Sequence, residues 1–436
     1  MWRRNRLVAL AAVALAAPGS ASEQAPQDYA LHAQATFTVQ GVPGFRTPYA
    51  GGNSLAPRQV RETADVTLFA GLRPWAGGEL WLNPEVDQGF GLSNTTGVAG
   101  FPSGEAYKVG RARPYFRLQR AFLRQTFALG AGRETVTAAA NQLAGSRPRD
   151  RLVLTAGKVA LGDIFDGNIY AHDPRVDFLN WSAIEAGTFD YAADAWGYAT
   201  GGAFDAVVGS WSVRAGAFNL SREPNGETLE RNFRQYQLTG EVERRFSVRG
   251  RPGAVRVTAF RSTGRFGRFN DAVALAAATR QPAELAAVRQ RRSRVGMSVN
   301  FEQALTETLG LLGRAGLANG AVEPYEFTDI DRSVLLGLSF SGARWRRPRD
   351  TTGLALIANG ISAAHQRFLA AGGLGLLVGD GRLGRPGGEY IAEGYYRLVT
   401  QQRVELTLDQ QFIVHPAYNH ERGPVSVTAL RLHFAL

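Results

Sequence analysis

VSVTALRLHFAL, residues 425–436, is the last segment of the chain. Its side chains alternate, with Leu430, Leu432, Phe434 and Leu436 on one face and Ala429, Arg431, His433 and Ala435 on the other. A period of two residues is typical of a β-strand whose two faces have different surroundings. Because chain ends fray unless a sheet holds them, we expect this strand to close a transmembrane barrel, with Arg431 and His433 facing water in a pore.

The N-terminal residues indicate export. Arg3, Arg4 and Arg6 precede an apolar run at 7–17, and small residues at 19–22 offer a cleavage site, which is the layout of a secretory signal. The run is eleven residues long, whereas a membrane-spanning helix needs about 20. We therefore expect a signal peptide at 1–22 and one exported domain at 23–436, which is either soluble or a barrel.

The composition favours a barrel. The chain has 51 Gly, 24 Phe and 13 Tyr but no Cys, so disulfides are not expected to hold it together. The formal net charge is +11, and loss of the three signal arginines leaves +8. The arginines are scattered along alternating strands rather than gathered in one patch, which argues against nucleic-acid binding.

The alternation of apolar and polar residues recurs along the whole chain. In the segment 29–40, Ala33, Ala35 and Phe37 share one face, while Thr36 and Thr38 share the other. Such segments number sixteen, near 29–40, 64–72, 80–82, 115–129, 152–158, 194–204, 211–219, 236–243, 255–259, 294–302, 309–311, 334–340, 353–358, 390–399, 403–412 and 425–436. The stretch 270–292 is different and predicts one or two short helices in a long loop.

Short and long connections mostly alternate between these segments. An even strand number, with short turns at one end and long loops at the other, is typical of a bacterial outer-membrane barrel. We therefore predict an all-β, transmembrane antiparallel β-barrel of about sixteen strands, with eighteen as the alternative. Short turns are expected on the periplasmic side and long loops outside, and a barrel of this size encloses an aqueous channel.

Nothing in the sequence predicts an enzyme, a cofactor or a metal site. The six histidines have no zinc-site spacing and there is no cysteine. No nucleophile motif of the G-x-S-x-G type is present.

Two loops carry the residue types that bind sugars. The first, at 83–107, combines carboxylates with Phe90 and several glycines, and the second, at 162–191, crowds polar and aromatic side chains together. Aromatic faces stack on sugar C–H surfaces, and Arg and carboxylate groups bind hydroxyls. The alternative is that the Asp and Arg side chains of a folded-in loop only pair with each other.

These loops resemble the carbohydrate-selective outer-membrane porins, the OprB-like family. The similar passages are HAQATFTVQGVPGFRTPYAGGNSL (32–55), RETADVTLFAGLRPW (61–75), NPEVDQGFGLSNTTGVAGFPSGEAYKVG (83–110), HDPRVDFLNWSAIEAGTFDYAAD (172–194) and PAYNHERGPVSVTALRLHF (416–434). The family typically ends on Phe, whereas Ala435 and Leu436 follow Phe434 here.

The resemblance implies passive, carbohydrate-selective diffusion of mono- or oligosaccharides through a channel that an inward-folded loop around 162–191 narrows. It places constriction roles on Glu85, Asp87, Tyr170, Arg175, Asp177, Asn180 and Trp181, and pore-wall roles on Arg256, Arg403 and Glu405. A general or anion-preferring porin is the alternative, because arginines in a lumen attract anions.

The location and partners follow from the same resemblance. We expect the bacterial outer membrane, contact with its lipid, recognition of the C-terminal strand by the barrel-assembly machinery, and either a monomer or a homotrimer.

Overall fold

A computed structural model describes residues 26–400 and 404–436. The expected signal peptide at 1–22 and the expected wall residue Arg403 lie outside the described residues. Within the described part, no helix is long and apolar enough to cross a membrane.

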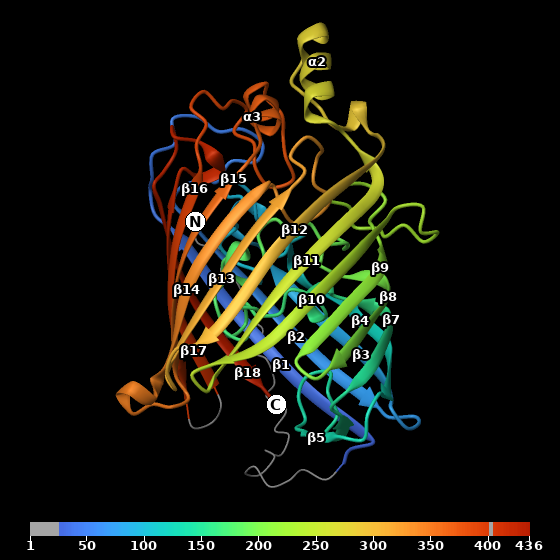
Figure 1. Ribbon diagram of the computed structural model, residues 1–436. Helices are drawn as coiled ribbons and strands as arrows, with labels where there is room; N and C mark the ends of the chain where they lie inside the picture. Colours follow the sequence, from blue (N-terminus) through green and yellow to red (C-terminus); the bar gives the residue numbers. More distant parts are fainter. Residues whose placement is uncertain (1–25, 401–403) are drawn as a thin grey trace.

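In the described part of the chain, sixteen antiparallel strands form one closed barrel (Figure 1). They are β1 (Tyr29–Val42), β2 (Gln59–Leu72), β3 (Gly78–Gly89), β4 (Arg111–Ala128), β7 (Arg151–Val159), β8 (Ala199–Val208), β9 (Trp211–Asn219), β10 (Tyr236–Val248), β11 (Arg251–Phe266), β12 (Gln290–Ala304), β13 (Leu309–Ala318), β14 (Arg332–Ser341), β15 (Thr351–Gly360), β16 (Glu389–Val399), β17 (Val404–Val414) and β18 (Val425–Ala435). The predicted fold and the count of sixteen are confirmed.

The connections hold the remaining elements. β5 (Arg133–Val136) and β6 (Gly145–Pro148) pair with each other in the connection after β4. The helices are α1 (Trp181–Ile184), α2 (Phe269–Thr279) and α3 (Ala363–Ala370), and the 3-10 turns are η1 (Leu92–Asn94), η2 (Leu161–Asp163), η3 (Ala286–Val288), η4 (Gly342–Trp345) and η5 (Pro416–Tyr418). α2 and η3 confirm the prediction of short helices in 270–292.

The last strand closes the barrel as predicted. β18 pairs with β1 on one side, where Phe37 lies opposite Leu432, and with β17 on the other. Leu430 and Phe434 are exposed on the outside, whereas Arg431 and His433 point inward and are buried. The expectation that these two residues face water is wrong, because folded loop backbone and neighbouring strands cover them.

The outer and inner faces of the wall have opposite character. Large apolar side chains are exposed on the outside, among them Leu68, Val242, Val257, Leu336, Leu356 and Leu408. The inside carries buried polar groups, among them Glu85, Asp87, Gln119, Glu241, Arg256, Asn300, Arg314 and Glu393. Lipid requires an apolar surface and a lumen tolerates polar groups, so this inversion identifies the wall as membrane-spanning.

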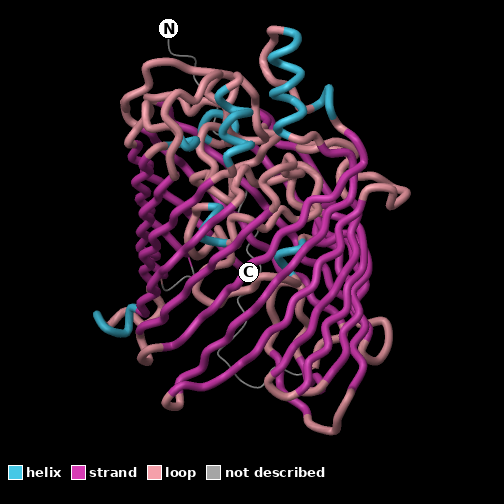
Figure 2. Tube along the Cα trace, turned by 45° about the horizontal axis from the view of Figure 1, so that its top comes forward, coloured by secondary structure: helices cyan, strands magenta, loops and turns pink. Residues whose placement is uncertain are grey.

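The long connections gather at one end of the barrel, except for the connection 129–150 at the short-turn end, and the segment 160–198 extends into the interior. Figure 2 shows loops and short helical turns inside the barrel wall. The buried aromatic side chains of this segment, Phe165, Phe178, Trp181, Phe189 and Tyr191, belong to one continuous cluster. The interior is therefore partly filled by protein, and the open path is much narrower than the barrel.

Candidate channel constriction

Arg314 on β13 fixes the segment 160–198 to the barrel wall. Its guanidinium donates hydrogen bonds to the backbone carbonyls of Ala183, Asp166 and Ala171, at 2.5, 3.1 and 2.9 Å. It also lies 3.2 Å from the Asp166 carboxylate. Because Arg314 is buried, these contacts satisfy groups that have no water to replace them.

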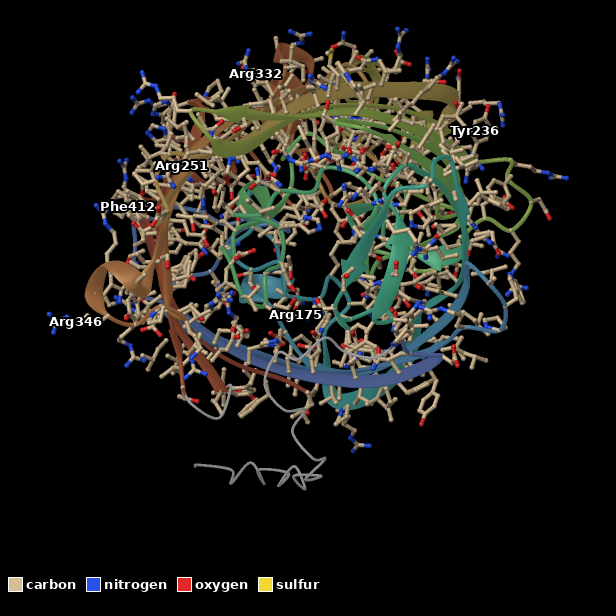
Figure 3. The ribbon with its side chains drawn as sticks, turned by 60° about the horizontal axis from the view of Figure 1, so that its bottom comes forward. Arg175, Tyr236, Arg251, Arg332, Arg346 and Phe412 are labelled. Carbon is tan, nitrogen blue, oxygen red and sulfur yellow. The ribbon has the colours of Figure 1, made fainter. Side chains whose placement is uncertain are left out.

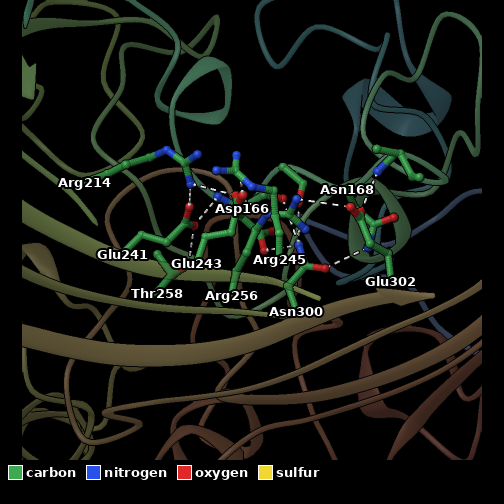
Figure 4. A network of polar contacts seen from close by, with 12 residues as sticks. Asp166, Asn168, Arg214, Glu241, Glu243, Arg245, Arg256, Thr258, Asn300 and Glu302 are labelled. Atoms are coloured by element: carbon green, nitrogen blue, oxygen red, sulfur yellow. Dashed lines mark hydrogen bonds and ion pairs between the residues drawn. The ribbon is translucent and has the colours of Figure 1, made fainter. Parts of the chain in front are cut away.

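Asp166 joins the same segment to the neighbouring strands (Figure 4). Its backbone N–H donates to Glu241 at 2.6 Å, and its carboxylate accepts from Asn300 Nδ2 at 2.8 Å. Asn168 donates to Asn300 Oδ1 at 2.7 Å. The side chains of Glu241 on β10 and Asn300 on β12 thus hold the loop at Asp166 and Asn168 in position against the wall.

Carboxylates on β16 hold the loops from the other side. Glu393 accepts the backbone N–H groups of Leu179 and Asn180, at 2.5 and 3.1 Å. Glu389 accepts those of Ala99 and Gly100, at 3.0 and 2.8 Å. Both the 90–110 loop and the 160–198 loop are therefore anchored by buried hydrogen bonds to carboxyl groups, and loss of these bonds would leave backbone N–H groups without partners.

Arg175 is the centre of the charged cluster at the tip of the loop. Its guanidinium lies 3.6 Å from Asp65, 3.9 Å from Glu85, 3.5 Å from Glu105 and 3.7 Å from Asp173. The Arg175 side chain is 18% exposed, and seen from the short-turn end it borders the central opening (Figure 3).

The electrostatics of this cluster follow from burial and from the excess of carboxylates. Burial by itself lowers the pKa of Arg175, but the surrounding carboxylates outweigh it and raise that pKa, so the guanidinium stays charged. Burial raises the pKa of the Glu105 carboxyl, against the opposing charge of Arg175. The Arg175 guanidinium and the Asp173 carboxylate, whose side chain is 44% exposed, therefore place a donor and an acceptor beside the open path, and the other three carboxyl groups are buried behind them.

Three of the residues predicted for the constriction come together here. Glu85 and Asp87 on β3 point inward, and Gln119 Nε2 on β4 donates to both carboxylates, at 3.1 and 3.3 Å. Glu85 also accepts from Thr67 at 2.6 Å and is the one that approaches Arg175. Asp87 is fully buried beneath them.

The other predicted loop residues have different surroundings. The Tyr170 ring lies over Gly310 on β13, and a Cβ there would come within 2.2 Å of it. Asp177 accepts the N–H groups of His172 and Asp173 and closes their turn.

Asn180 and Trp181 lie in the packed interior of the loop. Asn180 is buried, donates to Gly100 O and Gln411, and accepts from Ser182 N as the N-cap of α1. Trp181 is 4% exposed and stacks on Phe101 with ring centroids 5.2 Å apart. The Trp181 ring faces are therefore covered by protein.

The two described wall residues both point inward and both form ion pairs. Arg256 on β11 lies 3.0 Å from Glu243 and 3.1 Å from Glu302, and Glu405 on β17 lies 3.4 Å from Arg397. Arg214 on β9 extends the first network to Glu241 and Glu243. Charged groups thus line the interior wall of the barrel as well as the tip of the 160–198 loop.

A cavity of about 940 Å³ lies between the cluster and the short-turn end, and the residue-by-residue prediction missed most of its lining. Its arginines are Arg73, Arg120, Arg124, Arg133, Arg147, Arg151, Arg175 and Arg214, and its carboxylates are Glu79, Asp163, Asp173 and Asp205. The connection 129–150 folds over it, where Asn141 accepts from Asn83 and Arg124. Alternation along β4 carries the signal for Arg120 and Arg124, whereas nothing in the sequence predicts the fold of 129–150.

The arrangement suits a neutral polar solute. Guanidinium groups donate and carboxylates accept, so a hydroxyl-rich molecule finds partners of both kinds along the path. In residues 26–400 and 404–436, no group of three or more His, Asp or Glu side chains is placed to hold a metal ion.

Glu185, at the end of α1, makes the stability of the folded loop depend on pH. Burial, with the charge of Asp166, raises its pKa well above the usual 4.5. Since the folded chain then retains a proton that the unfolded chain has lost, the free energy of unfolding falls as the pH rises above that value. Urea unfolding of the barrel in vesicles measures this pH dependence. In Glu185→Gln the free energy of unfolding is expected to fall less with pH, whereas Glu307→Gln, in an exposed turn, is expected to keep the pH dependence of the parent. An unchanged pH slope in the first variant would contradict the assignment.

A closed barrel with an apolar outer surface, a charged lumen and inward-folded loops defines an outer-membrane channel. The model of the carbohydrate-selective porin, OprB family, matches residues 53–436, and the chain belongs to this family. It is a porin of the bacterial outer membrane through which sugars diffuse passively, not an enzyme.

Solved porin structures have the same fold. The high-pH structure of Pseudomonas putida OprB matches with a TM-score of 0.70 at 18% identity, over 94% of each chain. Its low-pH structure matches with a TM-score of 0.51 at 14% identity, over 94% of this chain and 93% of that chain. The Acinetobacter baumannii channel DcaP has a TM-score of 0.50 at 9% identity, over 94% and 97%. No curated protein sequence matches the chain.

Proposed function

We propose that the channel selects sugars at the cluster around Arg175, where the 160–198 loop narrows the barrel. The observation that carries this proposal is one partly exposed guanidinium among four carboxylates beside the opening. A sugar hydroxyl both donates and accepts, so it exchanges hydrogen bonds with either kind of group. A size-matched ion is attracted by one kind and repelled by the other.

The predicted residues take separate roles in this proposal. Arg175 contacts the solute, and the buried Glu85 supports Arg175, while Asp87 is joined to Glu85 through Gln119. Tyr170, Asp177, Asn180 and Trp181 hold the loop in position, since their contacts are with protein. Arg256 and Glu405 line the wall, and Arg403 belongs with them by its place in the alternation.

The experiment is a measurement of ion current through single channels in planar bilayers while glucose is added. Binding of glucose at the constriction is expected to reduce the ion current in a saturable way. An ion current that falls only with the viscosity of the solution would leave no site for sugar at Arg175.

An anion preference is a second candidate, which one observation favours. The cavity near the short-turn end is lined by eight arginines and four carboxylates. This excess of positive charge raises the local anion concentration. The reversal potential in a salt gradient, recorded before and after glucose addition, separates the two candidates. An anion preference that glucose leaves unchanged would place ion selection outside the sugar site.

The wider organisation completes the proposal. Residues 1–22 act as a signal peptide and 23–436 as a single barrel domain with its constriction at 162–191. The C-terminal strand is the part that the barrel-assembly machinery recognises, lipid surrounds the wall, and the barrel acts as a monomer or a homotrimer.

A further inference from the structure

Three arginines form a patch on the outside of the barrel. Arg261 and Arg265 lie on β11 and Arg291 lies on β12, and all three are exposed. By strand alternation they lie on the same outer face as the exposed Val257 and Val295. Arg256 and Ser262 lie on the opposite face and are buried inside the barrel. We call Arg261, Arg265 and Arg291 the outer arginine patch.

The patch lies at the level where the membrane meets water on the long-loop side. Tyr236, at the start of β10, pairs with Thr263, which lies midway between Arg261 and Arg265. Figure 3 places Tyr236 at the outer edge of the barrel. Tyrosines in such positions mark the lipid headgroup level of outer-membrane barrels. The guanidinium groups therefore flank the headgroups of the outer leaflet.

The charges of the patch have no internal compensation. Arg265 and Arg291 are directly opposite each other in the β11–β12 register, and like charges in this relation are destabilising. Arg291 donates to the carbonyl of Arg234 at 2.9 Å, and Arg261 donates to Ser293 at 3.4 Å. Within residues 26–400 and 404–436, none of the three arginines forms an ion pair, in contrast to the lumen arginines Arg214, Arg256 and Arg314.

An apolar groove of about 720 Å³ runs down the outer surface from the patch. Its lining consists of Leu154, Gly202, Ala203, Phe204, Ala215, Gly216, Ala217, Leu238, Thr239, Gly240, Ala259, Phe260 and Arg261. The small residues hollow the surface between Leu154, Phe204 and Leu238, and Arg261 belongs to both features. We call this feature the outer groove.

We propose that the outer arginine patch and the outer groove together bind one phosphate-bearing lipid of the outer leaflet. Its phosphate groups pair with the three guanidiniums, and one acyl chain lies in the groove. Arginine suits this role because its planar fork donates two hydrogen bonds to a phosphate. The lipid supplies the negative charge that the Arg265–Arg291 pair lacks.

The test is binding of lipid A to the full barrel in detergent, followed by native mass spectrometry. The triple variant Arg261→Gln, Arg265→Gln, Arg291→Gln is expected to bind lipid A at least about tenfold more weakly, because each charge-assisted hydrogen bond is worth about a factor of ten. The matched control is Arg344→Gln, Arg346→Gln, Arg349→Gln, which removes the same charge from an exposed turn at the other end. Lipid A binding by this control is expected to equal that of the parent.

A second variant tests the groove. Gly240 lines the groove, and a Cβ there meets only the carbonyl oxygen of Arg214, at 3.8 Å, so the side chain of Gly240→Leu takes up space in the groove. This variant is expected to lose lipid A while keeping its resistance to unfolding by sodium dodecyl sulfate. Equal lipid A binding by the parent and by either the patch variant or the Gly240→Leu variant would overturn the proposal. Complete displacement of lipid A from the parent by inorganic pyrophosphate would also overturn it, because the acyl chain would then contribute nothing.

Discussion

Replacing Arg175 by alanine is expected to make the channel cation-preferring and to abolish most of its preference for sugars. The substitution removes a guanidinium that lies within 4 Å of Asp65, Glu85, Glu105 and Asp173. The carboxylates then repel one another and attract cations into the path. Leaving buried carboxylates without their partner costs about 3–5 kcal/mol, so the loop tip is expected to shift as well.

The measurement for Arg175→Ala is the reversal potential in a salt gradient, together with the glucose dependence of the ion current. Arg175→Lys keeps the charge but loses the planar fork, and we expect it to retain the ion preference while binding glucose more weakly. Arg249→Ala is the control that changes the net charge alone, because Arg249 is exposed in the short turn between β10 and β11. An alanine variant with the parent's reversal potential would show that the cluster does not control the path.

Replacing Arg314 by leucine is expected to release the 160–198 loop from the wall and to raise the single-channel conductance several-fold. Arg314 satisfies three loop carbonyls and the Asp166 carboxylate at once. Leucine has a similar apolar stem but no donor, so these groups lose their partners in a buried place. The loss in docking free energy is expected to be about 3–5 kcal/mol, the usual cost of breaking a buried pair.

Single-channel conductance and limited trypsin digestion report the release of the loop. Trypsin is expected to cleave after Arg175 in Arg314→Leu and to leave the bond after Arg175 uncut in the parent. Arg251→Leu is the matched control, because its partner Glu307 is 87% exposed and such exposed pairs contribute about 0–1 kcal/mol. A leucine variant that keeps the parent's conductance and protease resistance would mean that the loop is held elsewhere.

The sequence predicts the wall of this molecule better than its interior. Strand alternation has a period of two whatever the barrel encloses, so the inward position of Arg256 and the closure of β18 on β1 follow from the pattern. The same pattern does not reveal what lies against an inward side chain. Arg431 is inward as predicted, but the carbonyls of Pro174 and Asp177 cover it.

The constriction is harder to predict because irregular loops have no such period. Residue types alone do not separate Arg175, which borders the opening, from Trp181, which packs on Phe101 six residues further along. The cluster also unites Asp65 and Glu105 with Arg175 across the barrel. Such contacts depend on the anchors at Arg314 and Glu393, whose partners are mainly backbone groups that any sequence contains.

Liposome swelling with the intact barrel tests the central claim most directly. The rates of entry of glucose and of an amino acid of matched size are compared in the same vesicles. Because the path offers both donors and acceptors to a hydroxyl-rich solute, glucose is expected to enter several-fold faster. Equal rates for the two solutes would contradict selection at the Arg175 cluster and would leave a general diffusion pore.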